Sequence, residues 1–283
     1  MRAMAHLRIV DLPAAGPLPP SLLVDIGQRR VDLALIRGVV DPARLAPVVS
    51  AIEARVADLP WVWQEADDPQ RPQMALLGSS LTPYNAFPDG PPLDHYLTQA
   101  DRFRALYAEL FQGVDLLGAA SAVLSRLGGD RPVAEPVGPD GRAFTPATLR
   151  RVPPGKGIPT HVGRWFQETG GFKPLLPQVE TSWQLSWFVP LQQGERGGEL
   201  IVYDLCYGDP AVPWREKGRV LDDDAIERGW QQEPILPGPG DLMVFNGGHL
   251  YHRVSPVQGS RPRFTFGGFV GLSADHRRLM RWN

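Results

Sequence analysis

The first part of the chain has apolar residues at helical spacing. Leu33 to Val40 is mostly apolar and predicts a short strand, and Asp41 and Pro42 follow it as a helix N-cap and first helical residue. Apolar residues then recur at three- and four-residue spacing, which predicts an amphipathic helix bearing Leu45, Val48, Val49, Ile52, Val56 and Leu59. A second helical region is predicted from about Leu93 to Leu127, where Gly128 and Gly129 end it.

From residue 143 onward the pattern changes to short alternating segments separated by glycine and proline. These segments predict strands over residues 143–152, 157–162, 184–190, 198–203, 241–245, 249–254 and 263–272. Many short strands with such turns are typical of a β-sandwich or jelly roll. We therefore predict one α+β, mainly β domain over residues 1–283, in which residues 1–140 form a mostly helical flank with pocket loops and residues 141–283 form the β core.

Two further segments lack a regular pattern. Residues 1–20 are rich in proline and predict an extended lead-in. Residues 60–92 predict a long loop, and a loop of this length in a compact domain is often functional. Its serine and aromatic residues either line a pocket or only cap the core, and the sequence leaves both alternatives open.

Composition narrows the class of protein. The chain has 283 residues, a formal net charge of −2 and 43% hydrophobic residues, so it lacks the basic field expected of a protein that binds nucleic-acid polymers. No apolar run is long enough to span a bilayer, and residues 1–10 do not form a signal peptide. Its single cysteine, Cys206, fits a reducing compartment. These features predict a soluble cytoplasmic protein with no membrane partner.

Two histidines on predicted strands are candidate metal ligands. His161 is followed by Val162 and Gly163, and His252 lies on a later strand. Iron oxygenases commonly bind the metal through two histidines and one carboxylate, the latter two residues after the first histidine. In this chain Gly163 occupies that carboxylate position, so the site would have one more open position for an anion. From spacing alone, an ordinary structural histidine is an equal alternative.

The returning strand contains two histidines, His249 and His252. They are three residues apart, so on a strand only one of them faces His161. We choose His252, because Val254 continues the strand beyond it, and interpret His249 as a turn or pocket-rim residue.

Arg263 and Thr265 follow on the next strand and share one face of it. A guanidinium and a hydroxyl form a receptor for a carboxylate, which indicates an anionic co-substrate such as 2-oxoglutarate. Arg261 is interpreted as a surface residue.

The chain resembles a known enzyme family in these motifs. The matching stretches include Phe144–Arg150, His161–Gly163, Gly197–Tyr203, Pro237–Asp241, Phe245–Gly248, Tyr251–Ser255 and Gly267–Phe269. They resemble the iron(II)/2-oxoglutarate-dependent aliphatic halogenases of the welwitindolinone and hapalindole alkaloid type, which act on freestanding small molecules. The resemblance covers most of residues 140–283 and, more weakly, the helical part.

The resemblance implies a double-stranded β-helix, a jelly-roll or cupin-like fold, with N-terminal flanking helices. It implies that His161 and His252 bind iron(II), that 2-oxoglutarate chelates the iron, and that chloride takes the position opened by Gly163. Arg263 and Thr265 would bind the distal carboxylate of 2-oxoglutarate, with Arg150 close to the co-substrate. With O2, such an enzyme chlorinates an unactivated sp3 carbon through a ferryl-chloride and hydrogen-atom abstraction.

The substrate is expected to be a freestanding alkaloid, nucleotide or amino-acid type of molecule, with no carrier protein. The segment from Arg164 to Trp183 differs from the alkaloid enzymes and is aromatic. Candidate substrate contacts are Ile158, Arg164, Trp165, Phe166 and Trp183, although such aromatic residues are often core residues.

Two other readings of the same motifs are a 2-oxoglutarate-dependent hydroxylase of the same fold and a non-catalytic barrel whose histidines are ordinary core residues. Chloride dependence of the product separates the halogenase from the hydroxylase, and iron content tests the barrel.

Overall fold

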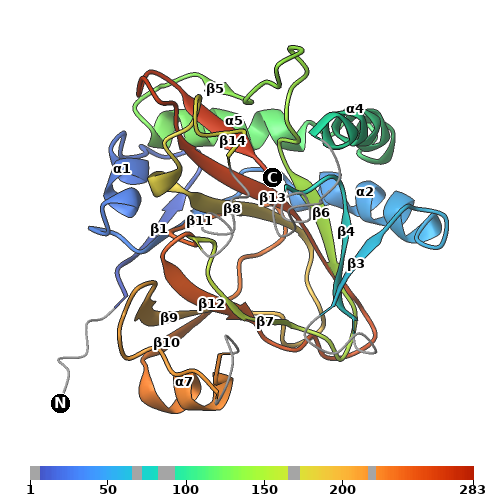
Figure 1. The fold of residues 1–283 in the computed structure, drawn as a ribbon. Coiled ribbons are helices and arrows are strands. Elements are labelled where there is room, and N and C mark those ends of the chain that lie inside the picture. The colour runs from blue at the N-terminus through green and yellow to red at the C-terminus, as the bar shows by residue number, and fades with distance from the viewer. Residues whose placement is uncertain (1–6, 66–71, 82–92, 165–172, 216–220) are drawn as a thin grey trace.

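The computed structural model describes residues 7–65, 72–81, 93–164, 173–215 and 221–283. Its centre consists of two β-sheets that face each other (Figure 1). The ten-stranded sheet contains, in spatial order, β1 (Ile9–Pro13), β2 (Leu33–Arg37), β11 (Leu242–Phe245), β8 (Leu185–Gln192), β13 (Arg263–Leu272), β6 (Thr148–Val152), β4 (Pro72–Leu77) and β3 (Val62–Glu65), with β14 (Leu279–Trp282) and β5 (Val133–Ala134) attached to it through β13. The four-stranded sheet has the order β10 (Gln232–Ile235), β9 (Leu200–Cys206), β12 (Leu250–Val254) and β7 (Ile158–His161). This pair of sheets is the predicted jelly roll.

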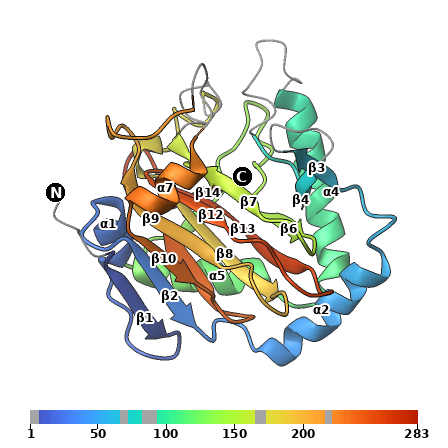
Figure 2. The same ribbon diagram turned by 90° about the horizontal axis from the view of Figure 1, so that it is seen from below.

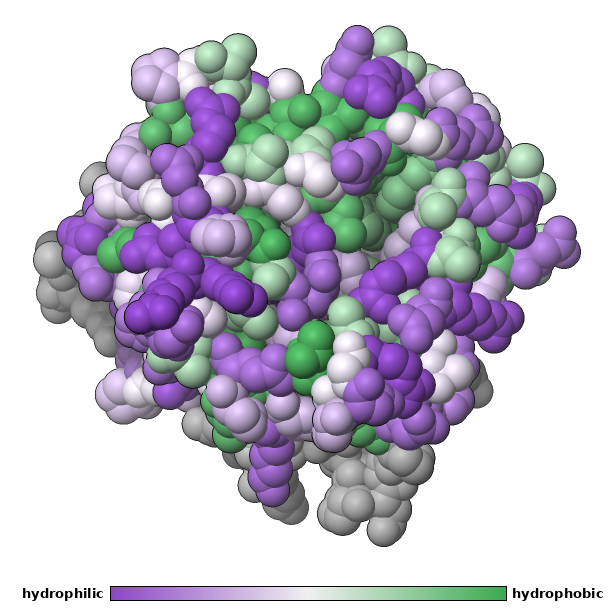
Figure 3. Space-filling view, turned by 90° about the horizontal axis from the view of Figure 1, so that it is seen from above, coloured by the Kyte–Doolittle hydropathy of each residue, from purple (hydrophilic) through white to green (hydrophobic). Residues whose placement is uncertain are grey.

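Helices cover the outer faces of both sheets. The larger sheet carries α1 (Leu22–Gly27), α2 (Pro42–Ala54), α4 (Leu93–Leu110) and α5 (Leu116–Leu127), which Figure 2 shows from below. The smaller sheet packs against α7 (Asp223–Gly229) through a separate apolar cluster. In the view of Figure 3, the surface is mostly hydrophilic and apolar side chains gather in a hollow. None of the described helices is long and apolar enough to cross a bilayer.

The predicted helices form where capping and spacing agree. The Asp41 side chain accepts a hydrogen bond from the backbone N–H of Ala43 at 2.9 Å, and α2 begins at Pro42 as expected. The long helical region is two helices rather than one. Asp115 caps the second helix by accepting from the Gly118 N–H at 2.7 Å, so the chain turns between residues 111 and 115.

The predicted strands of the β core are confirmed, with β13 at its predicted bounds and strand β6 limited to the end of its predicted range. One prediction for the first part of the chain is wrong, because the region predicted as a loop contains β3 and β4. The predicted extended lead-in contains β1, which pairs in parallel with β2. β4 pairs with β6 and β1 pairs with β2, and these contacts between separate segments are not visible in the local sequence pattern. Residues 66–71 and 82–92 of that loop lie outside the described residues.

Close backbone contacts fix the centre of the larger sheet. Gly267 of β13 lies so near β8 that a Cβ there would be 2.2 Å from the carbonyl oxygen of Trp187. The turn before β11 is held by Asp241, which is largely buried. Its carboxylate accepts from the N–H groups of Gly38 at 2.9 Å and Gly238 at 2.8 Å and from Arg37 at 3.0 Å. These contacts set the relative positions of the strands that form the site.

Candidate active site between the two sheets

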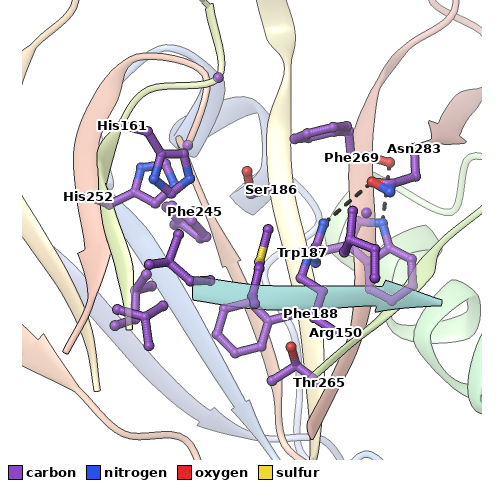
Figure 4. Close-up of a pocket in the computed structure, with 18 of the residues that line it drawn as sticks. Arg150, His161, Ser186, Trp187, Phe188, Phe245, His252, Thr265, Phe269 and Asn283 are labelled. Atoms are coloured by element: carbon purple, nitrogen blue, oxygen red, sulfur yellow. Dashed lines mark hydrogen bonds between the residues drawn. The ribbon is translucent and has the colours of Figure 1, made fainter. Parts of the chain in front are cut away.

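His161 and His252 lie side by side on the smaller sheet and point toward the larger one (Figure 4). They are direct cross-strand partners of β7 and β12, and their ring centroids are 4.2 Å apart. Phe245 packs edge-on against His252 with centroids 4.8 Å apart. The structure therefore brings together the two histidines that the sequence selected, although they are far apart in the chain.

Backbone hydrogen bonds orient both imidazole rings. Nδ1 of His161 is 2.8 Å from the carbonyl oxygen of Pro159, and Nδ1 of His252 is 2.8 Å from that of Leu250. Because a carbonyl only accepts, each Nδ1 carries the proton, and each Nε2 has its lone pair free. Burial lowers the pKa of both histidines, and the neighbouring His161 lowers that of His252 further. Two neutral imidazoles with orienting hydrogen bonds fit a divalent transition metal.

Gly163 lines the same cavity two residues after His161. Among the residues that the structure describes, no group of three or more histidine, cysteine, aspartate or glutamate side chains could hold a metal ion. Within this part of the chain, the two histidines are therefore not accompanied by a carboxylate. His249 lies in the turn before β12, as predicted, and Arg261 is exposed, as predicted.

The opposite wall of the cavity carries two arginines, of which Arg263 is buried and Arg150 is half-buried. Arg263 is 3% exposed, and its Nε has no hydrogen-bond partner among the described residues. Its guanidinium carbon is 5.4 Å from the centroid of the Phe188 ring. Thr265 is the cross-strand partner of Arg150, so Arg150, Thr265 and Arg263 share one face of the larger sheet. Burial lowers the pKa of each arginine to about 10, which leaves both charged at neutral pH.

Asn283 is a cavity residue that sequence reasoning missed. Its side-chain oxygen accepts from Arg150 Nη2 at 3.4 Å (Figure 4). Its side-chain nitrogen donates to Thr148 Oγ1 at 2.9 Å. The hydroxyl of Tyr96 donates to the backbone oxygen of Asn283 at 2.8 Å and so holds this residue in place. No local pattern marks Asn283, because its position depends on the pairing of β14 with β13.

The cavity between these groups has a volume of about 260 Å³. Apart from the histidines and arginines it is lined mainly by apolar side chains, among them Met74, Leu76, Ile158, Phe188 and Phe269. Met74 and Leu76 belong to β4, so the region predicted as a possible pocket wall does contribute to the cavity. Ser186 on β8 adds a hydroxyl that the sequence analysis did not select. No aspartate or glutamate is among the described residues that line the cavity.

Only one of the predicted substrate contacts among the described residues, Ile158, lines the cavity. Trp183 does not, because its ring packs against Gly27 of α1, where a Cβ would lie only 2.6 Å from it. Arg164 is half-buried and its backbone N–H donates to the carbonyl of Gly248 at 3.0 Å, but it is not among the cavity residues. Trp165 and Phe166 lie outside the described residues.

Solved structures show which class of proteins has this fold. An N-substituted L-amino acid dioxygenase from Burkholderia ambifaria AMMD matches with a TM-score of 0.55 and 16% identity over 92% of this chain and 91% of its own. The non-heme alpha-ketoglutarate-dependent carbocyclase SnoK from nogalamycin biosynthesis matches with a TM-score of 0.50 and 13% identity over 91% of this chain and 89% of its own. No curated protein matches the chain. The jelly roll is therefore that of the 2-oxoglutarate-dependent oxygenases.

Within this class the family is shown by the sequence. The chain belongs to the family described as carrier-protein-independent halogenase WelO5, whose family model matches residues 10–283. This match confirms the resemblance inferred from the motifs and the predicted class of enzyme, an iron(II)/2-oxoglutarate-dependent oxidoreductase. The predicted cofactors iron(II), 2-oxoglutarate, O2 and chloride are those of this family, and its substrates are freestanding rather than bound to a carrier protein.

Proposed function

We propose that this protein chlorinates an unactivated sp3 carbon of a freestanding small molecule. His161 and His252 would hold the iron through Nε2, and chloride would take the position that Gly163 leaves open. The observation that carries this proposal is the glycine beside an oriented histidine pair, in a cavity with no described aspartate or glutamate on its wall. An aspartate at position 163 would compete with chloride for the metal.

The two arginines of the cavity wall would supply the charge that an anionic co-substrate needs. Arg263 presents an Nε without a partner in the described part of the chain, and Thr265 lies two residues further on the same face. A guanidinium and a hydroxyl in a water-poor wall fit the distal carboxylate of 2-oxoglutarate. Arg150 faces the cavity beside Thr265 and adds a second positive charge close to the co-substrate. Bound iron, 2-oxoglutarate and O2 supply the oxidant that removes a hydrogen atom from the substrate.

The choice between chlorination and hydroxylation depends on where the substrate carbon lies. The apolar wall formed by Ile158, Met74, Leu76 and Phe269 would hold the hydrocarbon part of the substrate and exclude water. Chlorination would require this wall to hold the target carbon close to the position beside Gly163 where chloride would bind. Alkaloid, nucleotide and amino-acid types of substrate all contain unactivated sp3 carbons. Of the predicted substrate contacts, Ile158 is the one that lines the described cavity.

Anaerobic titration with iron(II) and 2-oxoglutarate tests the proposal without knowledge of the substrate. The expected result is a metal-to-ligand charge-transfer band that appears with 2-oxoglutarate and shifts when chloride is added. A band that is indifferent to chloride would contradict the halogenase and favour a hydroxylase of the same fold. Absence of the band together with absence of bound iron would mean that the histidines are structural.

A further inference from the structure

Position 163 requires glycine because its surroundings leave no room for a Cβ, and not because of its backbone conformation. Its φ lies outside the left-handed region in which glycine is favoured, so other residues fit its backbone conformation. A Cβ on Gly163 would, however, lie 2.8 Å from Nε2 of Gln184 and 3.1 Å from the carbonyl oxygen of Gly247. Even alanine at this position requires the Gln184 side chain to move.

Gln184 is fixed by the elements that meet at this end of the cavity. It lies between the short 3-10 helix Thr181–Trp183 and strand β8, and it is 1% exposed. Its backbone oxygen accepts from the N–H of Gly248 at 3.2 Å. A Cβ on Gly248 would be 2.5 Å from that same oxygen. The backbone of Gln184 is therefore packed against the turn that precedes β12.

The turn at residues 247–248 also binds the backbone of Gly163. The N–H of Gly163 donates to the carbonyl of Gly247 at 2.8 Å, and the next residue, Arg164, donates to the carbonyl of Gly248 at 3.0 Å. Gly163 and Gln184 are thus tied to adjacent residues of one turn. This arrangement holds the Gln184 amide beside the position where related oxygenases have a carboxylate.

An amide N–H is a suitable donor to an anion and carries no charge that would prevent the anion from reaching the metal. We propose that Gln184 is a halide-positioning residue: its side chain occupies the space that a residue larger than glycine needs at position 163, and its amide donates to the anion bound in the position so opened. This inference rests on the proposed halogenase function. It assigns to the residue that precedes β8 a part of the site that the motif around His161 does not contain.

Two replacements of Gln184 separate shape from hydrogen bonding. Gln184→Met keeps the length of the side chain but removes the N–H donor, and Gln184→Glu keeps the shape but replaces the donor with a carboxylate oxygen. Gln193→Met is the matched control, because it removes an amide that donates to the Pro237 carbonyl at 2.7 Å near the far end of β8.

The measurement is the chloride dependence of the charge-transfer band in the anaerobic complex with iron(II) and 2-oxoglutarate. We expect chloride to bind about ten-fold or more weakly in Gln184→Met and not detectably in Gln184→Glu, with unchanged 2-oxoglutarate affinity in Gln184→Met. The control should respond as the wild-type protein does. If the wild type responds to chloride and both Gln184 variants respond equally well, this inference is wrong while the proposed function stands. If the wild type itself does not respond, the proposed function fails and the inference fails with it.

The proposal that Gln184 restricts the size of residue 163 can be tested without metal. Gly163→Ala should lower the Tm of the apo protein, and the loss should be clearly smaller when Gln184→Ala is present, because the smaller side chain makes room for the Cβ. Additive effects of the two substitutions would show that Gln184 does not restrict position 163.

Discussion

Replacing Arg263 with methionine is expected to abolish 2-oxoglutarate binding while leaving the apo protein as stable as before or more stable. Arg263 is buried, and its Nε has no hydrogen-bond partner in the described part of the chain. A buried charge of this kind is unfavourable in the absence of the anion that it binds. Methionine has a similar length and fills the same space without a charge.

The magnitude follows from the surroundings of Arg263. Burial lowers its pKa from its ordinary value to about 10, which corresponds to roughly 3 kcal/mol against the charged form. Contact with the Phe188 ring at 5.4 Å offsets roughly 1 to 2 kcal/mol of this. The substitution should therefore raise the free energy of unfolding of the apo protein by roughly 1 to 2 kcal/mol. Loss of the partner for a desolvated carboxylate should weaken 2-oxoglutarate binding by at least roughly a hundred-fold.

Thermal unfolding with and without 2-oxoglutarate and iron(II), under anaerobic conditions, measures both effects. Wild-type protein should gain Tm as the 2-oxoglutarate concentration rises, because the ligand binds the folded state. Arg263→Met should start at an equal or higher Tm and gain nothing. Arg261→Met is the control, since Arg261 is exposed and two residues away.

Two results would refute this reasoning. A large loss of apo stability in Arg263→Met would mean that the guanidinium stabilises the fold through partners other than a ligand. A 2-oxoglutarate-dependent rise in Tm equal to that of the wild type would mean that the carboxylate binds elsewhere, and Arg150 would then be the first residue to test.

Three further substitutions test other parts of the structure. His161→Ala should abolish stoichiometric iron binding in a metal-content assay, whereas His249→Ala should retain it; equal retention by both would remove His161 from the metal site. Asp241→Ala leaves two backbone N–H groups without their acceptor, so it should lower the free energy of unfolding by roughly 2 to 4 kcal/mol. Urea unfolding measures this loss, and a loss below about 1 kcal/mol would show that water replaces the carboxylate. Gly267→Ala should destabilise the fold by at least about 2 kcal/mol, because its Cβ would clash with the β8 backbone. Gly229→Ala is the control and should be close to neutral, because the space around Gly229 is open. Similar effects of the two substitutions would contradict this packing.

The β core and the histidine pair were predictable because their signals are local. Period-2 alternation and turn residues mark β13, and the same period places Arg263 and Thr265 on one face, as the structure has them. Selecting His252 over His249 needed only strand geometry and the continuation of the strand at Val254. The helix after Asp41 was predictable from its cap and its apolar spacing.

The rest of the site depends on contacts between distant segments. Gln184 is adjacent to Gly163 only because both are hydrogen-bonded to the turn at 247–248, and Asn283 reaches Arg150 only through the pairing of β14 with β13. Trp183 shows the same dependence on distant contacts. Its aromatic ring suggested a substrate contact, but its place beside Gly27 follows from the packing of α1, which nothing in its own neighbourhood indicates.

The pairing of β7 with β12 has a consequence for how this site tolerates change. His161 and His252 are opposite residues in one strand pair, and β12 has a register shift directly after His252. Adjacent residues of a strand face opposite sides, so a slip of one residue would turn Val162 toward the cavity and His161 into the apolar layer under α7. The distance between the two histidines thus depends on the alignment of the two strands and not only on which residues they carry. Adding one residue between Gly157 and His161 would turn His161 away from the cavity while every side chain of the site remained in the sequence.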